Sequence, residues 1–163
     1  MRSVRDIPKL ENVSVLLRTS LNVPIENGKV TNTFRLKSAL LTIEYLKKRH
    51  AKVILISHIT GKGTESLHPM YEAMKEYLPD ISFCTVSVGE EARKAVRAMV
   101  PGDVLMLENL RRNHGEEKND PEFAKELASL ADVFVQDSFD VCHRKHASVV
   151  GVPKLLPSFA GLL

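Results

Sequence analysis

Acidic, basic and imidazole side chains crowd one short stretch of this sequence, QDSFDVCHRKHAS at residues 136–148. These acidic, basic and imidazole residues are Asp137, Asp140, His143, Arg144, Lys145 and His146. The stretch directly follows ADVFV, an apolar run that predicts a buried strand. Ligands of open α/β sheets bind beyond the carboxyl ends of strands. Exposed loops are polar without any ligand, so the stretch by itself is compatible with both interpretations.

Polar residues of the same kinds follow three other predicted strands. They are Arg18, Ser20 and Asn22 after the first strand, Ser57 and His58 after the second, and Asn109, Arg111 and Arg112 after the fourth. Arg35 opens the first predicted helix, and the loop before it can bring it to the same edge. Because arginine binds carboxylate and phosphate through a two-pronged hydrogen-bonding group, this convergence predicts a site for a small polyanion.

Each of these residues also has a purely structural interpretation. His58 fits a satisfied histidine packed beside the sheet, and Arg111 with Arg112 fits a solvated face. The glycine-rich TGKG at residues 60–63 lacks the spacing of a Walker A loop, so it is a weak phosphate-binding signal.

Metal binding is not expected from the sequence. His143 and His146 have no third ligand at a suitable spacing. Cys84 and Cys142 also lack metal-ligand spacing, and without a secretion signal they are expected to be two reduced thiols.

The elements that would position these residues alternate along the chain. Strands are predicted at residues 13–17, 51–57, 81–87, 102–109 and 132–139, and helices at 34–50, 67–79, 89–100 and 120–131. This alternation predicts an α/β fold, a three-layer α/β/α sandwich with a mostly parallel, Rossmann-like sheet. The length of 163 residues suits one domain, residues 1–163.

Composition limits the class of protein. Hydrophobic residues make up 44% and charged residues 26%, and the net charge is +3, so nucleic-acid binding is not expected. No apolar run approaches the roughly 20 residues that span a bilayer, and the N-terminus has no apolar signal region. We therefore expect a cytoplasmic protein without membrane contact.

The last segment, VPKLLPSFAGLL at residues 152–163, is unusually apolar for the end of a chain. It fits either a terminal helix packed on this domain or a surface that leads into a further domain. An exposed apolar patch usually marks an interface. We therefore predict self-association, or binding of a partner protein, through this segment.

The ordered motifs resemble those of the phosphoglycerate kinase family. The similarity runs from about residue 13 to the end, and LENLR, GEEKNDPEFAKELASLAD and HRKHAS are its most specific parts. The resemblance implies a two-domain kinase that transfers phosphoryl between 1,3-bisphosphoglycerate and ADP in glycolysis. In that family the N-terminal half binds phosphoglycerate, the C-terminal half binds Mg-ATP, and a hinge closes the two.

By this resemblance the chain looks like the N-terminal half alone, truncated before the nucleotide-binding domain. No cofactor is expected on this chain, since Mg-ATP or Mg-ADP would need that second domain. Kinase activity of the chain alone is not expected, so its status as an enzyme is open. The alternative is a divergent, non-catalytic paralogue that acts as an anion-binding or protein-interaction module.

The resemblance also assigns site residues. The family's phosphoglycerate ligands fall on Asn22, Arg35, His58, Arg111 and Arg144, and Arg35 matches the catalytic arginine that stabilises the transferring phosphoryl. 3-Phosphoglycerate or another small anion is therefore the expected, weakly bound ligand.

Three positions depart from the family pattern. Ser20 stands where the family has an Asp that holds a substrate hydroxyl, and Gly61 stands where it has a phosphate-binding Arg. Lys62, one residue on, supplies a charge without the planar guanidinium. Asp140 replaces a usual Gly, which places a carboxylate beside an anion site. We expect these departures to weaken anion binding.

Overall fold

A six-stranded parallel sheet forms the centre of the computed structural model, which describes residues 2–163. Its strands are β1 (Ser14–Thr19), β4 (Lys52–Ile56), β5 (Ser82–Cys84), β6 (Val104–Leu107), β7 (Val133–Asp137) and β8 (Ser158–Ala160). They lie in the order β5-β6-β4-β1-β7-β8, and every neighbouring pair is parallel. A separate hairpin pairs β2 (Ile25–Glu26) with β3 (Lys29–Val30).

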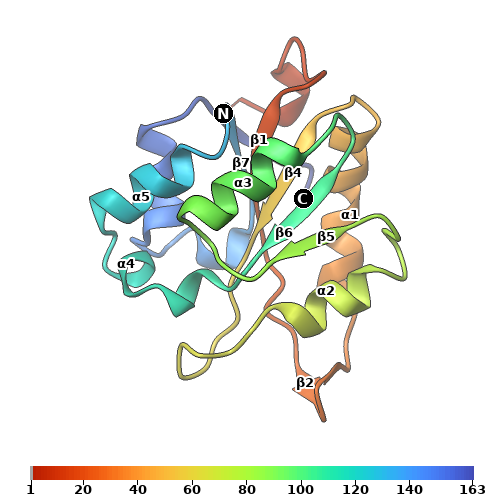
Figure 1. The fold of residues 1–163 in the computed structure, drawn as a ribbon, viewed down its shortest axis with the longest axis vertical. Helices are drawn as coiled ribbons and strands as arrows, with labels where there is room; N and C mark the ends of the chain where they lie inside the picture. Colours follow the sequence, from red (N-terminus) through yellow and green to blue (C-terminus); the bar gives the residue numbers. More distant parts are fainter. Residues whose placement is uncertain (1) are drawn as a thin grey trace.

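Helices cover both faces of the sheet (Figure 1). Helices α1 (Phe34–Lys47) and α2 (His68–Met74) pack on one face, and α3 (Glu90–Ala98) and α5 (Pro121–Ala128) on the other. The shorter elements are α4 (His114–Glu117), the 3₁₀ turns Val4–Asp6, Leu110–Arg112, Phe139–Val141 and Val152–Lys154, and a π-helical turn at Ala147–Gly151. The predicted three-layer fold is thereby confirmed.

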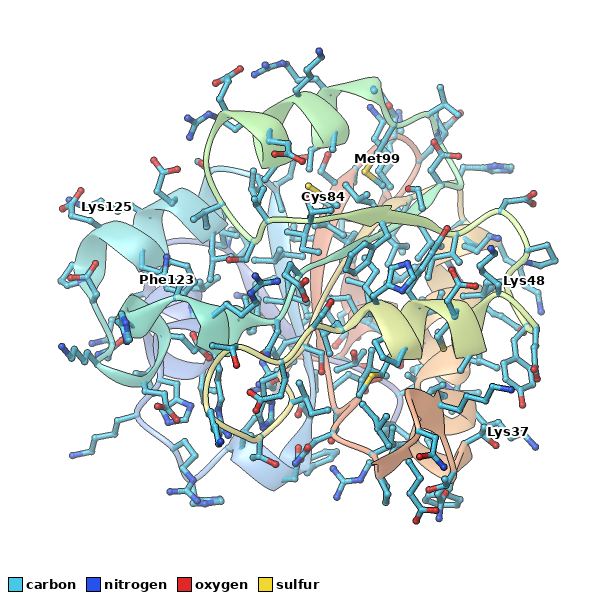
Figure 2. The ribbon with its side chains drawn as sticks, turned by 60° about the horizontal axis from the view of Figure 1, so that its bottom comes forward. Lys37, Lys48, Cys84, Met99, Phe123 and Lys125 are labelled. Atoms are coloured by element: carbon cyan, nitrogen blue, oxygen red, sulfur yellow. The ribbon has the colours of Figure 1, made fainter. Side chains whose placement is uncertain are left out.

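Alternate residues of each central strand enter different cores. In β1, Val15 and Leu17 join the core under α1 and α2, and Leu16 joins the core under α3 and α5. Figure 2 shows Cys84 and Met99 on the α3 side, in the same core as Leu16. This two-sided burial explains why the strands read as continuous apolar runs.

The predicted elements exist, but the structure shortens several of them. Helix α2 ends at Met74, so the expected stretch to residue 79 finishes in turns, although Leu78 is still buried. Strand β5 covers only Ser82–Cys84 of the expected 81–87. Hydrophobic periodicity reports burial, and apolar residues in the adjoining turns are buried as well.

Helix α5 begins as its sequence predicts. The carboxylate of Asp120 accepts a hydrogen bond from the Phe123 amide at 2.8 Å, and Pro121 occupies the first turn. We expect Asp120→Ala to lower the free energy of unfolding by about 1 kcal/mol, measured by urea denaturation. Asp80→Ala, in an exposed loop, is the control, and an equal loss in both variants would contradict the capping role.

The C-terminal segment contains a sheet strand, and not the terminal helix that one of the two alternatives predicted. Strand β8 pairs with β7, Phe159 is 9% exposed, and the Leu162 amide donates to Thr42 Oγ1 at 3.0 Å. A strand of three residues is too short to show a clear alternation in sequence. Leu155 and Leu163 stay about half exposed, and association through residues 152–163 stays a prediction.

Two further findings bear on the class of protein. Within residues 2–163, no helix combines the length and apolar character needed to cross a membrane. Both cysteines are free thiols, with Cys84 buried and Cys142 exposed.

Candidate functional site

The carboxyl ends of the strands bring the predicted site residues to one edge of the sheet. Strand β4 lies on one side of β1 and β7 on the other, so the order in which strands are added to the sheet reverses beside β1. Open α/β sheets bind ligands at such a reversal of strand order. We use the name strand-end rim for Ser20, Asn22, Arg35, His58, Arg111, Asp140 and Arg144, which follow these strands or contact residues that do.

Arg35, Ser20 and Asp140 form one hydrogen-bonded group. Arg35 lies in the first turn of α1 and donates from Nη1 to Asp140 Oδ2 at 2.7 Å and to Ser20 Oγ. Ser20 in turn donates to Asp140 Oδ2 at 2.7 Å, and Ser138 donates to Oδ1 at 2.6 Å. Two of the three departed positions, Ser20 and Asp140, are therefore in contact although 120 residues of sequence separate them.

Asp140 is a carboxylate that stays negatively charged at neutral pH. Its partial burial by itself would raise its pKa, but hydrogen bonds from Ser138, Ser20 and Arg35 outweigh burial and lower the pKa to about 2. Arg35 keeps 42% of its side chain exposed. The pair is thus a half-exposed ion pair that a ligand from solvent can reach.

Arg18 is part of the scaffold behind the rim, although its strand-end position suggested a ligand contact. It is fully buried and donates to Thr19 O at 2.6 Å, Ser148 Oγ at 3.1 Å and His58 Nδ1 at 2.8 Å. Burial lowers its pKa, and the nearby Glu116 carboxylate opposes that effect. All the side-chain contacts of Arg18 point into the protein, so we correct its assignment to a structural one.

Ser148 connects Arg18 to a buried carboxylate. Its hydroxyl accepts from Arg18 Nε and donates to Glu116 Oε1 at 2.5 Å, and its amide donates to Glu116 Oε2 at 2.9 Å. Glu116 is fully buried on the short helix α4. The chain therefore compensates one buried cation with one buried anion through a serine.

His58 lies at the end of β4 and is 3% exposed. Arginine has only donors, so Nδ1 of His58 must accept the Arg18 hydrogen bond, and the ring proton stays on Nε2. Burial, with the charges of Arg18 and Arg111, lowers the His58 pKa to about 3. His58 is therefore a neutral imidazole that packs against the buried Arg18, and its role as a ligand stays a prediction.

The remaining rim residues are held less tightly. Asn22 Oδ1 accepts from the amide and hydroxyl of Thr60, both at 3.2 Å, beside an open hollow of about 600 Å³. Arg111 is 15% exposed, with Nε 3.3 Å from Glu117 Oε1. That Nε–H is buried without a well-directed hydrogen bond inside the described residues.

Arg112 and Arg144 differ from Arg111. Arg112 pairs with the buried Glu108 at 2.8 Å, so the two neighbouring arginines do not form one solvated face. Arg144 is exposed after β7. The charges of Arg111 and Arg144 both act on His146, and the charge of Arg111 also acts on His58 and Arg18, so these two cations lie near the same buried residues.

Sequence reasoning missed Glu65, Glu116 and Ser148. Glu65 accepts three backbone amides of its own loop, and the other two hold Arg18. Glu116 and Ser148 are buried polar residues and Glu65 is partly exposed, and no periodic pattern in the sequence marks any of the three.

Comparison with known proteins identifies relatives along the whole chain. The family model "Phosphoglycerate kinase" matches residues 4–163. The phosphoglycerate kinase of Coprothermobacter proteolyticus is 46% identical over 100% of this chain and 43% of its own length, and that of Moorella thermoacetica is 47% identical over 95% and 41%. The chain thus spans less than half the length of these relatives.

Solved structures agree with the sequence matches. The phosphoglycerate kinase of Pyrococcus horikoshii OT3 superimposes with a TM-score of 0.92 at 30% identity, covering 100% of this chain and 43% of its own. That of Coxiella burnetii gives a TM-score of 0.84 at 32% identity, covering 97% and 40%. Since the family model extends over nearly every residue and the fold agrees, this chain belongs to the phosphoglycerate kinase family.

Proposed function

We propose that this chain supplies the phosphoglycerate-binding half of a phosphoglycerate kinase. The observation that carries the proposal is the presence of three arginines in the rim, Arg35, Arg111 and Arg144, at the carboxyl ends of the strands around β1. In the relatives the match covers about two fifths of the protein, so we assign the nucleotide and its metal to a further domain or a separate chain.

The rim residues suit different parts of the ligand. Arg35 is half exposed on the first turn of α1, where a guanidinium stabilises negative charge spread over a transferring phosphoryl group. Arg111 and Arg144 provide charge for the distal phosphate. Neutral His58 offers an Nε2–H donor whose protonation does not change near neutral pH.

Binding of 3-phosphoglycerate tests the proposal. We expect amide shifts in an NMR titration of the whole chain to cluster at the rim. Arg35→Ala and Arg111→Ala should each weaken binding by roughly 10- to 100-fold, because each removes a charge-assisted hydrogen bond of about 1.5–3 kcal/mol. Arg97→Ala, on the exposed surface of α3, should leave affinity unchanged. Shifts that cluster elsewhere would refute the proposal.

Catalysis by the isolated chain is a separate prediction. We expect no ATP-dependent phosphorylation of 3-phosphoglycerate above a protein-free blank, because transfer needs a bound Mg-nucleotide and exclusion of water by domain closure. A coupled assay of ADP release would detect turnover. Activity that disappears in Arg35→Ala would show that the chain is catalytic alone.

A further inference from the structure

Two of the chain's own carboxylates occupy positions where donors converge at the strand-end rim. Asp140 occupies Nη1 of Arg35, as described above. Glu65 occupies the second position, where its carboxylate accepts hydrogen bonds from the amides of Lys62 at 2.6 Å, Gly63 at 2.9 Å and Thr64 at 3.1 Å. Successive amides that point at one anion form a nest, a backbone arrangement that binds phosphate and carboxylate groups.

The Glu65 nest lies beside the residues proposed to bind the ligand. Thr60, at the start of the loop that carries Glu65, donates two hydrogen bonds to Asn22 Oδ1. At Gly63 a Cβ atom would lie 3.3 Å from the carbonyl oxygen of Arg111, so the loop touches the backbone there. Asn109 fixes the other end of the loop by donating to the Glu65 carbonyl oxygen at 2.8 Å. The nest therefore sits between Asn22 and Arg111.

We infer that Asp140 and Glu65 are internal ligands that occupy the anion positions of the rim and compete with an incoming phosphate or carboxylate. This inference rests on the proposed function, because it assumes that the rim binds small anions. It also specifies the ligand class. A ligand with two anionic groups can replace both carboxylates, whereas a single small anion replaces at most one.

The competing carboxylates also account for the two neighbouring departures. A Cβ atom at Gly61 would overlap the Glu65 carboxylate, so no larger side chain fits while Glu65 holds the nest. Ser20 donates to Asp140, and an aspartate there would bring two like charges together. Ser20→Asp is therefore expected not to improve anion binding.

Neutral, isosteric variants test the inference. Asp140→Asn, Glu65→Gln and their combination are titrated with inorganic phosphate and with 3-phosphoglycerate, at low salt and constant pH. Each single change should raise the affinity for 3-phosphoglycerate roughly tenfold, the order expected for one charge-assisted contact, and the combination should raise it further. Glu117→Gln is the control: it removes a carboxylate that is 60% exposed beside Arg111 but forms no well-directed hydrogen bond with it, and it should change affinity by less than about threefold.

The outcomes separate the two proposals. If the wild-type chain binds at the rim, but Asp140→Asn and Glu65→Gln change affinity no more than Glu117→Gln, the inference is wrong and the proposed function stands. If no variant binds either anion at the rim, both are wrong. In the wild-type chain, addition of 3-phosphoglycerate should shift the amide signals of residues 62–64. Unchanged signals there, with a response at Arg35, would refute the role of Glu65 without relying on any variant.

Discussion

Replacing Arg18 with methionine is expected to lower the free energy of unfolding by about 3–5 kcal/mol, the usual cost of removing one partner from a buried charge pair. Methionine keeps much of the volume but none of the donors. The change would leave Glu116 buried without its compensating cation, and would leave His58 Nδ1 and Ser148 Oγ without the Arg18 donor. Urea denaturation monitored by circular dichroism measures the loss.

Two comparisons make this prediction specific to the buried pair. Arg97→Met removes an exposed arginine of α3 and should change stability by less than about 0.5 kcal/mol. Combining Arg18→Met with Glu116→Gln should cost less than the sum of the single changes, because residues in one network are not additive. A loss below about 1 kcal/mol in Arg18→Met, or strict additivity, would contradict a coupled pair.

Acid should destabilise the protein well above the range in which carboxylates titrate. His58 has a pKa of about 3 in the folded chain, compared with 6.5 as the ordinary value. Between these two values His58 is protonated in the unfolded chain but not in the folded chain. The free energy of unfolding that is present above pH 6.5 is therefore lost as the pH falls towards 3. One such proton gives a slope of about 1.4 kcal/mol per pH unit.

Other groups add to this profile in known directions. The lowered pKa of His146 acts in the same sense as that of His58, and burial is its main cause. Asp140, with a pKa of about 2 against 3.8, contributes stability that is lost only below about pH 4. Burial raises the pKa of Asp137, so its contribution runs the opposite way. The interval from pH 6 to 5 lies above the range in which Asp140 titrates, so it is the range in which to compare histidine variants.

The variant His58→Asn tests the assignment. Asparagine keeps an oxygen acceptor near the Nδ1 position and cannot take up a proton, so stability should depend less on pH between 6 and 5. His50→Asn changes an exposed histidine whose φ of 57° suits asparagine, and it should keep the wild-type slope. An unaltered slope in His58→Asn, measured by urea denaturation across this interval, would rule out His58 as the main acid-sensitive group.

The local order of elements was determined by the sequence itself. Apolar runs such as residues 51–57 and the Asp120–Pro121 helix start depend on neighbours a few residues away, and the structure agrees on both. Parallel strands must end at one edge, so the sequence could also predict that Ser20, His58 and Asp140 lie at the same side of the sheet. The family motifs added which of these positions departs from the usual residue.

Only the tertiary structure decided what each charge at that edge does. Arg18 and Arg35 are both arginines of the predicted site. Arg18 is fully buried and is linked to Glu116 through Ser148, whereas Arg35 is about half exposed and pairs with Asp140. The Asp140–Ser20 contact joins residues 120 positions apart. Such contacts depend on strand order and on loop conformation. Distant parts of the chain therefore determine whether a charge is buried and which residue it pairs with, and this leaves no periodic pattern in the sequence.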